Sequence, residues 1–308
     1  MDIFENMNIK PMLIGADSAP FDSPDYIYEL KLDGERCIAY LDKDGTELRN
    51  KRNVRILTKV PELSGIHRQV NKRCILDGEL FVMKDGKPDF FEIQRRSLMS
   101  NRVRIELASK QYPASFVAFD ILYLEDRQLT DLPLMERKAL LEQTVTENER
   151  LALSRYIEGQ GIALYEFTKQ QELEGIVAKR KDSRYYFGKN TKDWIKIKNL
   201  LDDDFVVCGY IYKERYMASL ILGAYDQQNN LINCGHATIG VSNEAFKRIL
   251  QVDRLNYPFF AEESPQAIWL KPELVCTVKY LARTKGGGLR HPVFKGLRTD
   301  KAPDECKI

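Results

Sequence analysis

Apolar runs of strand length alternate with turn residues over the first 200 residues of the chain. Residues 26–32, 36–41 and 116–123 are the clearest of these runs, and each predicts a strand with at least one buried face. Helices are expected between them at residues 134–143 and 162–173, where apolar and charged positions recur with helical spacing. The pattern therefore predicts a mixed α+β fold for this part of the chain.

Three of the Asp-Gly pairs in the sequence lie between or within these apolar runs. Asp33-Gly34 separates the first two runs, and Asp44-Gly45 follows the second. Asp77-Gly78 interrupts the apolar stretch 74–82 in the same way. Because Asp-Gly between apolar runs is typical of tight turns, we expect a hairpin at each place.

The pattern changes after residue 198. The acidic stretch 201–204 predicts a short hinge, which would make residues 1–200 one domain and residues 201–308 another. A helix capped by Ser242 is expected in the second domain. Its predicted strands are residues 205–212, 218–225, 231–237 and, as the last strand, 274–281. Short strands around one helix suit a small barrel of the OB type, and a sandwich fits this pattern nearly as well.

Composition agrees with two globular domains. The chain has 308 residues, of which 44% are hydrophobic and 30% are charged, so two apolar cores can form. No stretch resembles a signal peptide or approaches the ~20 apolar residues of a membrane span, which predicts a cytoplasmic protein without membrane contact. The six scattered cysteines form no CxxC pair and are expected to be reduced thiols in the core.

Net charge is only +2, so a nucleic-acid partner can be argued only from where the charges lie. Residues 178–198 carry eight Lys and Arg against two Asp, and residues 271–308 carry nine against four acidic residues. Such runs suit contact with a phosphate backbone. Taken alone, they are more often solvated faces.

Candidate chemistry begins at Lys31, in the pattern Lys-x-Asp-Gly-x-Arg. Glu29 and Lys31 are two apart on a predicted strand and therefore share a face. The turn after them should place Lys31 beside Arg36. Taken alone, this pattern fits an exposed hairpin with a solvated lysine equally well.

Further charged residues occur in apolar surroundings. Glu79 and Glu174 each follow or precede a glycine in an otherwise apolar run, and Lys196 and Lys198 share one strand face with Trp194. Two neighbouring lysines repel each other unless an anion such as a triphosphate lies between them. A solvent-facing basic edge is the alternative.

Seven segments together resemble the ATP-dependent DNA ligases of the covalent nucleotidyltransferase superfamily. They occur in sequence order with suitable spacing: residues 31–36, 51–53, 76–80, 119–122, 174–179, 196–198 and 298–301. Residues 288–298 resemble the small, two-domain bacterial end-joining and repair type in particular. The resemblance implies a nucleotidyltransferase (adenylation) domain at residues 1–200 and an OB-fold domain at residues 201–308.

The family's reaction has three steps, and the resemblance implies that Lys31 is the nucleophile. It would attack the α-phosphate of ATP, pass AMP to a 5′-phosphate, and allow a 3′-hydroxyl to displace AMP. A free lysine has a pKa of ~10.4 and is protonated at neutral pH. Lys196, Lys198 and Mg²⁺ would lower the pKa of Lys31 and stabilise the phosphates.

The remaining roles are also carried over from the resemblance. Glu79 and Glu174 would bind Mg²⁺, for which Mn²⁺ can substitute, with Glu174 the better candidate and Glu79 nearer the ribose. Phe119 would stack on adenine, and Glu29 would accept a hydrogen bond from its amino group. The expected cations around the phosphates and ribose are Arg36, Arg52 and Lys179. Two cations of the second domain, Arg298 and Lys301, would close over pyrophosphate, and Asp300 lies between them in the sequence.

Expected partners are ATP and nicked or broken duplex DNA, with an end-binding or other repair protein as a further candidate. The chain is expected to act as a monomer in DNA repair, and to bind the DNA backbone without reading bases. An RNA ligase or a GTP-dependent capping nucleotidyltransferase is the nearest alternative. A non-catalytic nucleic-acid-binding OB protein is the alternative of a different class.

Overall fold

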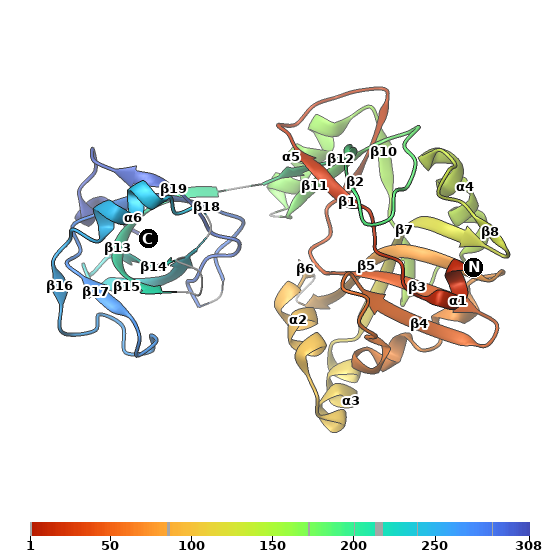
Figure 1. Ribbon diagram of the computed structural model, residues 1–308, viewed down its shortest axis with the longest axis horizontal. Coiled ribbons are helices and arrows are strands. Elements are labelled where there is room, and N and C mark those ends of the chain that lie inside the picture. Colours follow the sequence, from red (N-terminus) through yellow and green to blue (C-terminus); the bar gives the residue numbers. More distant parts are fainter. Residues whose placement is uncertain are drawn as a thin grey trace. The chain divides into compact units, whose positions relative to one another are not determined.

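The structure is a computed structural model that describes residues 2–84, 87–171, 173–199, 201–212, 218–238, 240–284 and 286–308. Two compact units divide the chain, Met1–Asn199 and Leu200–Ile308 (Figure 1). Each unit has its own sheet system and its own apolar core.

A five-stranded sheet forms one half of the first unit (Figure 1). Its strands, in spatial order, are β1 (Leu13–Asp17), β12 (Asn190–Lys198), β11 (Gly175–Arg180), β2 (Tyr26–Leu30) and β10 (Tyr156–Glu158). Helix α5 (Gly161–Gln170) packs against β2 and β11. Tyr28, Ile176, Ala178 and Ile197 form the core on that side.

A second, larger sheet forms the other half of the first unit. Its main strands, in spatial order, are β4 (Gly45–Asn50), β3 (Glu35–Asp42), β5 (Cys74–Lys84), β7 (Ala114–Leu124) and β8 (Arg127–Gln128), with β6 (Lys87–Pro88) and β9 (Leu151–Leu153) at its margins. The associated helices are α1 (Ile3–Asn6), α2 (Phe90–Leu98), α3 (Arg102–Gln111) and α4 (Leu134–Thr144).

The structure confirms the three predicted strands of this unit as β2, β3 and β7, and the two helices as α4 and α5. Helix α5 ends at Gln170, three residues before the predicted end. The hairpin at Asp44-Gly45 is also confirmed, since β3 and β4 pair antiparallel up to Asp42 and Gly45.

The other two hairpin predictions are wrong. Asp33-Gly34 joins β2 to β3, which belong to different sheets, so the chain crosses between sheets there. Asp77-Gly78 lies within the continuous strand β5, where the pairing with β7 shifts register. A side chain at Gly78 would lie 2.3 Å from the Val117 carbonyl oxygen, so the glycine permits a close approach of two strands rather than a turn.

A strongly curled sheet makes up most of the second unit (Figure 1). Its elements are β13 (Leu201–Tyr212), β14 (Ala218–Tyr225), β15 (Leu231–Ala237), α6 (Asn243–Ile249), β16 (Arg254–Leu255), β17 (Ile268–Leu270), β18 (Val275–Tyr280) and β19 (Val293–Arg298). β13 pairs with β18 along its first half and with β14 along its second half, so one long strand links both sides of the sheet. The Ser242 side chain caps α6 by accepting from the Ala245 amide, as predicted.

Two predictions for this unit are wrong. The acidic stretch 201–204 is not a hinge, because its residues open β13 and pair with residues 277–280 of β18. Strand β18 is also not the last, since β19 follows and pairs with it. The charged residues of these strands made them hard to recognise by apolar pattern.

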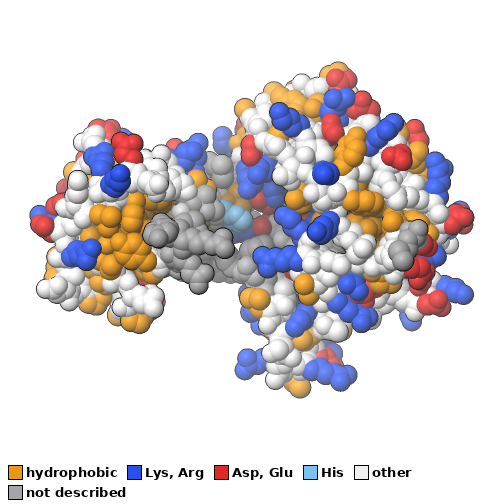
Figure 2. Space-filling model, viewed as in Figure 1, with side chains coloured by type: hydrophobic (Ala, Val, Ile, Leu, Met, Phe, Trp, Pro, Cys, Tyr) orange, Lys and Arg blue, Asp and Glu red, His pale blue; other side chains and the backbone are white. Residues whose placement is uncertain are grey.

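All six cysteines are free in this structure, and all six are buried, as expected for core residues. Among the described residues, no helix is long and apolar enough to cross a membrane. On the face of the first unit seen in Figure 2, lysine and arginine side chains are spread widely, with acidic side chains among them toward the rim.

Candidate active site

A pocket opens between the two sheets of the first unit. Its lining residues come from both sheets and from the link between them: Ile14, Glu29, Leu30, Lys31, Leu32, Arg36, Glu79, Phe119, Ser154, Val177, Lys179 and Trp194. The crossing at Asp33-Gly34 explains why Lys31 and Arg36 meet here. Lys31 directly follows the last residue of β2, and Arg36 lies at the start of β3, so the short link between them spans the seam.

Lys31 lies at the open end of this pocket, where its side chain is 20% exposed. Its backbone amide donates to the Gly175 carbonyl at 2.9 Å, which holds it beside β11. Its ammonium group contacts both carboxylate oxygens of Glu174, at 2.8 and 2.9 Å. The Lys31 side chain is thus held inside the site and does not extend into bulk water.

Glu174 also faces the end of β12. Lys198 Nζ lies 3.9 Å from Glu174 Oε1, so one buried carboxylate lies between two ammonium groups. Burial lowers the pKa of Lys198, and the nearby positive charges of Lys31 and Lys196 lower it further. A phosphate entering here would meet a positive field that Glu174 only partly balances.

Glu79 lines the same pocket from β5. Burial raises its pKa to about 7, although the Arg36 and Lys31 charges oppose the shift. The negative charges of Asp77 and Glu174 add to the increase. A nearby cation would stabilise the ionised form of such a carboxylate and so lower the cost of its burial.

The aromatic end of the pocket contains Phe119 and Trp194, whose ring centroids lie 6.0 Å apart in an edge-to-face arrangement. Lys179 Nζ lies 4.1 Å from the Phe119 centroid and 4.3 Å from that of Trp194. The Arg36 guanidinium lies 4.5 Å from the same Phe119 centroid. Phe119, Lys179 and Arg36 are therefore neighbours, as the sequence predicted for residues around one nucleotide.

Glu29 is buried at this end and is surrounded by donors. It binds Lys179 Nζ at 2.9 Å, Ser154 Oγ at 2.9 Å, and the ammonium group of Lys138. Burial lowers the pKa of Lys179 to about 8, although the charge of Glu29 opposes that shift. Both carboxylate oxygens of Glu29 already have protein partners, so this side chain fixes Lys179 as well as facing the pocket.

Arg36 is fixed by a buried partner that the motif comparison did not single out. Its Nε and Nη2 atoms donate to the two carboxylate oxygens of Asp77, each at 2.6 Å, and Nη2 also reaches the Met12 carbonyl at 3.2 Å. The Tyr185 hydroxyl donates to Asp77 at 2.6 Å. This bidentate pair sets the plane of the guanidinium group beside Phe119.

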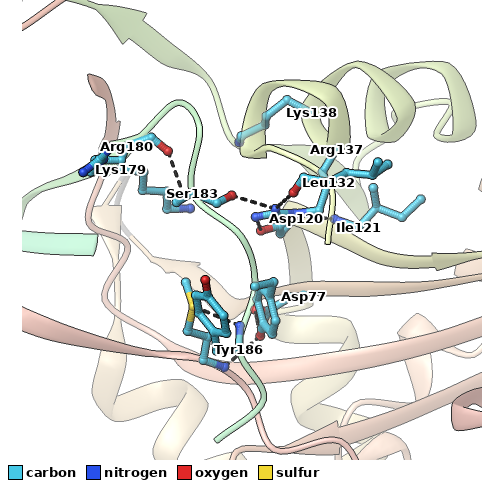
Figure 3. Close-up of polar contacts among 12 residues, drawn as sticks. Asp77, Asp120, Ile121, Leu132, Arg137, Lys138, Lys179, Arg180, Ser183 and Tyr186 are labelled. Atoms are coloured by element: carbon cyan, nitrogen blue, oxygen red, sulfur yellow. Dashed lines mark hydrogen bonds and ion pairs between the residues drawn. The ribbon is translucent and has the colours of Figure 1, made fainter. Parts of the chain in front are cut away.

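A second buried pair braces the same half of the molecule. Arg137 of α4 donates to both oxygens of Asp120 on β7, and also to the carbonyls of Leu132 and Ser183 (Figure 3). Arg137 and Asp120 have no exposed side-chain surface. The network joins α4, β7 and the loop after β11, and it holds the strand that carries Phe119.

Several predicted site residues lie elsewhere. Arg52 is on an exposed turn after β4 and does not line the pocket. Lys196 lies near the open end, 3.3 Å from Asp17, without lining the pocket either. Arg298 and Lys301 belong to the second unit, where both bind Asp204 at 3.2 and 3.0 Å.

Sequence reasoning missed three residues that shape this site: Lys138, Ser154 and Asp77. Lys138 had a detectable signal, because it shares an apolar helix face with Leu134 and Leu141. A lysine on such a face must find a buried partner. Asp77 lies within an apolar strand and carried the same kind of signal, whereas Ser154 had none.

Glu79 and Glu174 are the two carboxylates that were predicted to bind Mg²⁺. Among the residues that the structure describes, no group of three or more His, Cys, Asp or Glu is arranged to hold a metal ion. The negative charge of Glu174 is close enough to contribute to the raised pKa of Glu79. Oxygen ligands of this kind fit Mg²⁺ when substrate phosphates and water complete its coordination.

This pocket, with a lysine bound to a buried carboxylate beside further lysines and an aromatic end, suits covalent transfer of a nucleotide. Comparison with protein families identifies the class of protein more closely. Residues 13–198 match the ATP dependent DNA ligase domain, and residues 213–301 match the ATP dependent DNA ligase C terminal region. The chain belongs to the ATP-dependent DNA ligase family.

Individual relatives agree with this assignment. The chain is 26% identical to the SPbeta prophage-derived DNA ligase-like protein LigB of Bacillus subtilis, over 95% of this chain and 100% of that protein. It is 29% identical to DNA ligase C1 of Mycolicibacterium smegmatis, over 99% of this chain and 94% of that protein. It is 30% identical to a DNA ligase of Thermococcus fumicolans, but covers only 53% of that protein's length.

Solved structures show the same architecture. A mycobacterial DNA ligase D complexed with ATP and MES is 26% identical, with a TM-score of 0.58 over 97% of this chain and 98% of that chain. The predictions of an α+β adenylation domain followed by an OB-fold domain, and of an ATP-dependent DNA ligase, are confirmed. ATP is the nucleotide that the family uses.

Proposed function

We propose that this chain seals breaks between a 5′-phosphate and a 3′-hydroxyl in duplex DNA, through an AMP group bonded to Lys31. One observation carries the assignment of the nucleophile. Lys31 is the lysine at the mouth of the pocket, and Glu174 holds its amine at 2.8 Å beside Lys198. Positioning of this kind supplies much of the rate enhancement in phosphoryl transfer.

In the first step, the Lys31 amine bonds to the α-phosphorus of ATP, and the bond to pyrophosphate breaks. The amine must lose a proton to attack. The Lys31 side chain is 20% exposed, so solvent can take that proton, and Glu174 is the group in contact that orients the amine. Lys198, whose pKa is lowered by burial, and Lys196 stabilise the charge on the phosphates. AMP then passes to the DNA 5′-phosphate, and the 3′-hydroxyl finally displaces it.

At the aromatic end, we propose that adenine lies against Phe119. Lys179, oriented by Glu29, is the nearest charged donor to a base in that position. Arg36, held in plane by Asp77, would contact the ribose and phosphates. Glu29 would favour ATP over GTP, both through this orientation and through its own carboxylate.

Glu79 and Glu174 would hold Mg²⁺, with Mn²⁺ as a substitute. The bound ion would neutralise phosphate charge during the first step. The raised pKa of Glu79 supports this role, because a carboxylate that burial makes costly to ionise gains most from a nearby cation.

We further propose that DNA is bound through its backbone by the basic stretches 178–198 and 271–308, with Arg52 on the exposed turn after β4 as an additional contact. Backbone contacts predict affinity that falls steeply with salt and varies little with sequence. Relatives from Mycobacterium tuberculosis that are named multifunctional non-homologous end joining DNA repair proteins support a role in break repair. An end-binding or other repair protein is the partner that we propose for this role.

The test is transfer of label from α-labelled ATP to the protein and then to nicked DNA. Wild-type protein should take up label, release it to nicked DNA and seal the nick. Lys31→Ala should lose the uptake and still seal a nick whose 5′ end is already adenylated, at a reduced rate. Uptake by Lys31→Ala would contradict the assignment, and preference for GTP or for nicked RNA would favour the capping or RNA-ligase alternative.

A further inference from the structure

The acidic start of β13 holds basic side chains from the end of the chain. Asp204 accepts from Thr277 Oγ1 at 2.5 Å, from Arg298 Nη1 at 3.2 Å and from Lys301 Nζ at 3.0 Å. Arg298 also donates two bonds of 2.7 Å to Asp300, through Nε and Nη2. All three guanidinium nitrogens of Arg298 therefore already contact carboxylates.

Burial differs sharply within this cluster. The Asp204 side chain is 12% exposed, whereas those of Lys301, Arg298 and Asp300 are 25%, 38% and 67% exposed. Asp204 is therefore the member that cannot rely on water when its partners leave. A buried carboxylate that loses its cations is left with an uncompensated charge, and among the described partners of Asp204 the Thr277 hydroxyl alone would remain.

The charges of the cluster cancel, because two carboxylates face two cations. In this arrangement Arg298 and Lys301 offer little net attraction to a triphosphate. We propose that Asp204 is a positioning residue that retains Arg298 and Lys301 on the second unit, so that these pairs must open before either cation reaches the phosphates of ATP. This inference rests on the proposed function, and on the role in the first step that the resemblance to ATP-dependent DNA ligases implies for Arg298 and Lys301.

A pre-equilibrium of this kind has a defined kinetic signature. When only a fraction of molecules has the cations released, the apparent affinity for ATP falls by that fraction, while the rate at saturating ATP is unchanged. Asp204 should therefore influence KM for ATP in self-adenylation more than the maximal rate. Sealing by protein that already carries AMP should not depend on Asp204.

The test measures self-adenylation with labelled ATP over a range of concentrations. Asp204→Asn keeps the shape and the bond from Thr277, but removes the charge, and should lower KM for ATP by about threefold to tenfold with little change in maximal rate. Thr277→Val removes the other partner of Asp204 and should raise KM by about twofold. The opposite signs distinguish retention from general loss of structure, which would move both variants in the same direction.

Two variants serve as controls. Asp203→Asn alters the neighbouring residue, which binds Tyr280 and Arg283 instead, and should leave KM unchanged. Asp204→Glu keeps the charge and should stay within about twofold of the wild type. A raised KM in Asp204→Asn, or equal effects of Asp203→Asn and Asp204→Asn, would overturn the inference. Failure of wild-type protein to take up label would instead contradict the proposed function.

Discussion

The effects of burial and of ion pairing on the pKa values of charged residues are balanced differently in the two units. At three charged residues in and beside the pocket of the first unit, burial outweighs pairing: it raises the pKa of Glu79 and lowers those of Lys179 and Lys198, all toward the neutral form. Glu29 in the same pocket differs, because the charges of Lys138 and Lys179 lower its pKa despite its burial. In the cluster of the second unit, pairing outweighs burial. There the pKa of Asp204 is lowered despite its burial, because Thr277 and Lys301 donate to it.

The difference shows which region is complete without a ligand. The pocket contains charges that are only partly compensated, so a nucleotide and a cation would relieve a cost that folding has imposed. The cluster around Asp204 is neutral and satisfied, so it stabilises one arrangement of its cations and resists their removal. A ligand-binding site is expected to resemble the pocket, with charges that are only partly compensated. A cluster that holds side chains in one arrangement is expected to resemble the one around Asp204.

The largest expected effect is on stability, and it comes from the buried ion pair of Arg137 and Asp120 in the first unit. Asp120→Asn leaves Arg137 with an uncompensated charge and no access to water, so the free energy of unfolding should fall by about 3–5 kcal/mol. Urea denaturation measures this change. Glu273→Gln, which breaks the exposed pair with Lys271 in the second unit, is the matched control and should cost less than about 1 kcal/mol. Equal losses of unfolding free energy in the two variants would show that burial of an ion pair does not determine how much its removal costs.

The next effect concerns catalysis. Glu174→Gln removes the charge that holds Lys31 and half of the proposed metal ligands, so self-adenylation should slow by at least about a hundredfold at saturating ATP and Mg²⁺. Single-turnover label uptake measures it. Glu158→Gln alters a carboxylate of β10 that pairs with Lys181 on the surface, and should leave the rate unchanged. A normal rate in Glu174→Gln would refute the role assigned to this carboxylate.

Much of this contrast was visible in the sequence, because the motifs combine residue type with strand pattern. Lys31, Glu79, Phe119 and Lys179 were all predicted and all line one pocket. What the pattern could not supply was the partner of each charge. Lys138 reaches Glu29 from a helix more than 100 residues away, and local spacing contains no record of such a contact.

The failed hairpin predictions have the same origin. A turn signal reports a change of direction in the chain, but it does not report which strands pair afterwards. β2 pairs with residues 176–180 of β11 instead of with β3, and that pairing creates the seam where Lys31 lies. Residues 201–204 likewise looked like a hinge because their partners, on β18 and β19, come from the far end of the chain.

A smaller effect is expected in the dependence of stability on pH. Burial raises the pKa of Glu79 to about 7 in the folded protein, above the ordinary value of 4.5 for a glutamate, so the folded state holds this proton more tightly than the unfolded state. Between those two values, the free energy of unfolding should therefore fall as pH rises, by about 2 kcal/mol after allowance for partial exposure, and should then level off. In Glu79→Gln this loss should be absent. The measurement is denaturation of wild-type and Glu79→Gln protein in EDTA at pH 5 and at pH 8. An equal change in unfolding free energy in both proteins would show that burial does not control the pKa of this carboxylate.

The smallest effect should come from Asp300, which accepts two bonds of 2.7 Å from Arg298 and yet is 67% exposed. Its pKa is lowered to about 2 by the bonds from Arg298, which implies a strong local pair. Water replaces an exposed partner readily, however, so Asp300→Asn should leave the melting temperature unchanged within error. Arg298 retains Asp204 in that variant, and KM for ATP should change less than in Asp204→Asn. If Asp300→Asn instead lowered KM more than Asp204→Asn did, the exposed carboxylate would be the one that retains Arg298, and burial would not decide which partner matters.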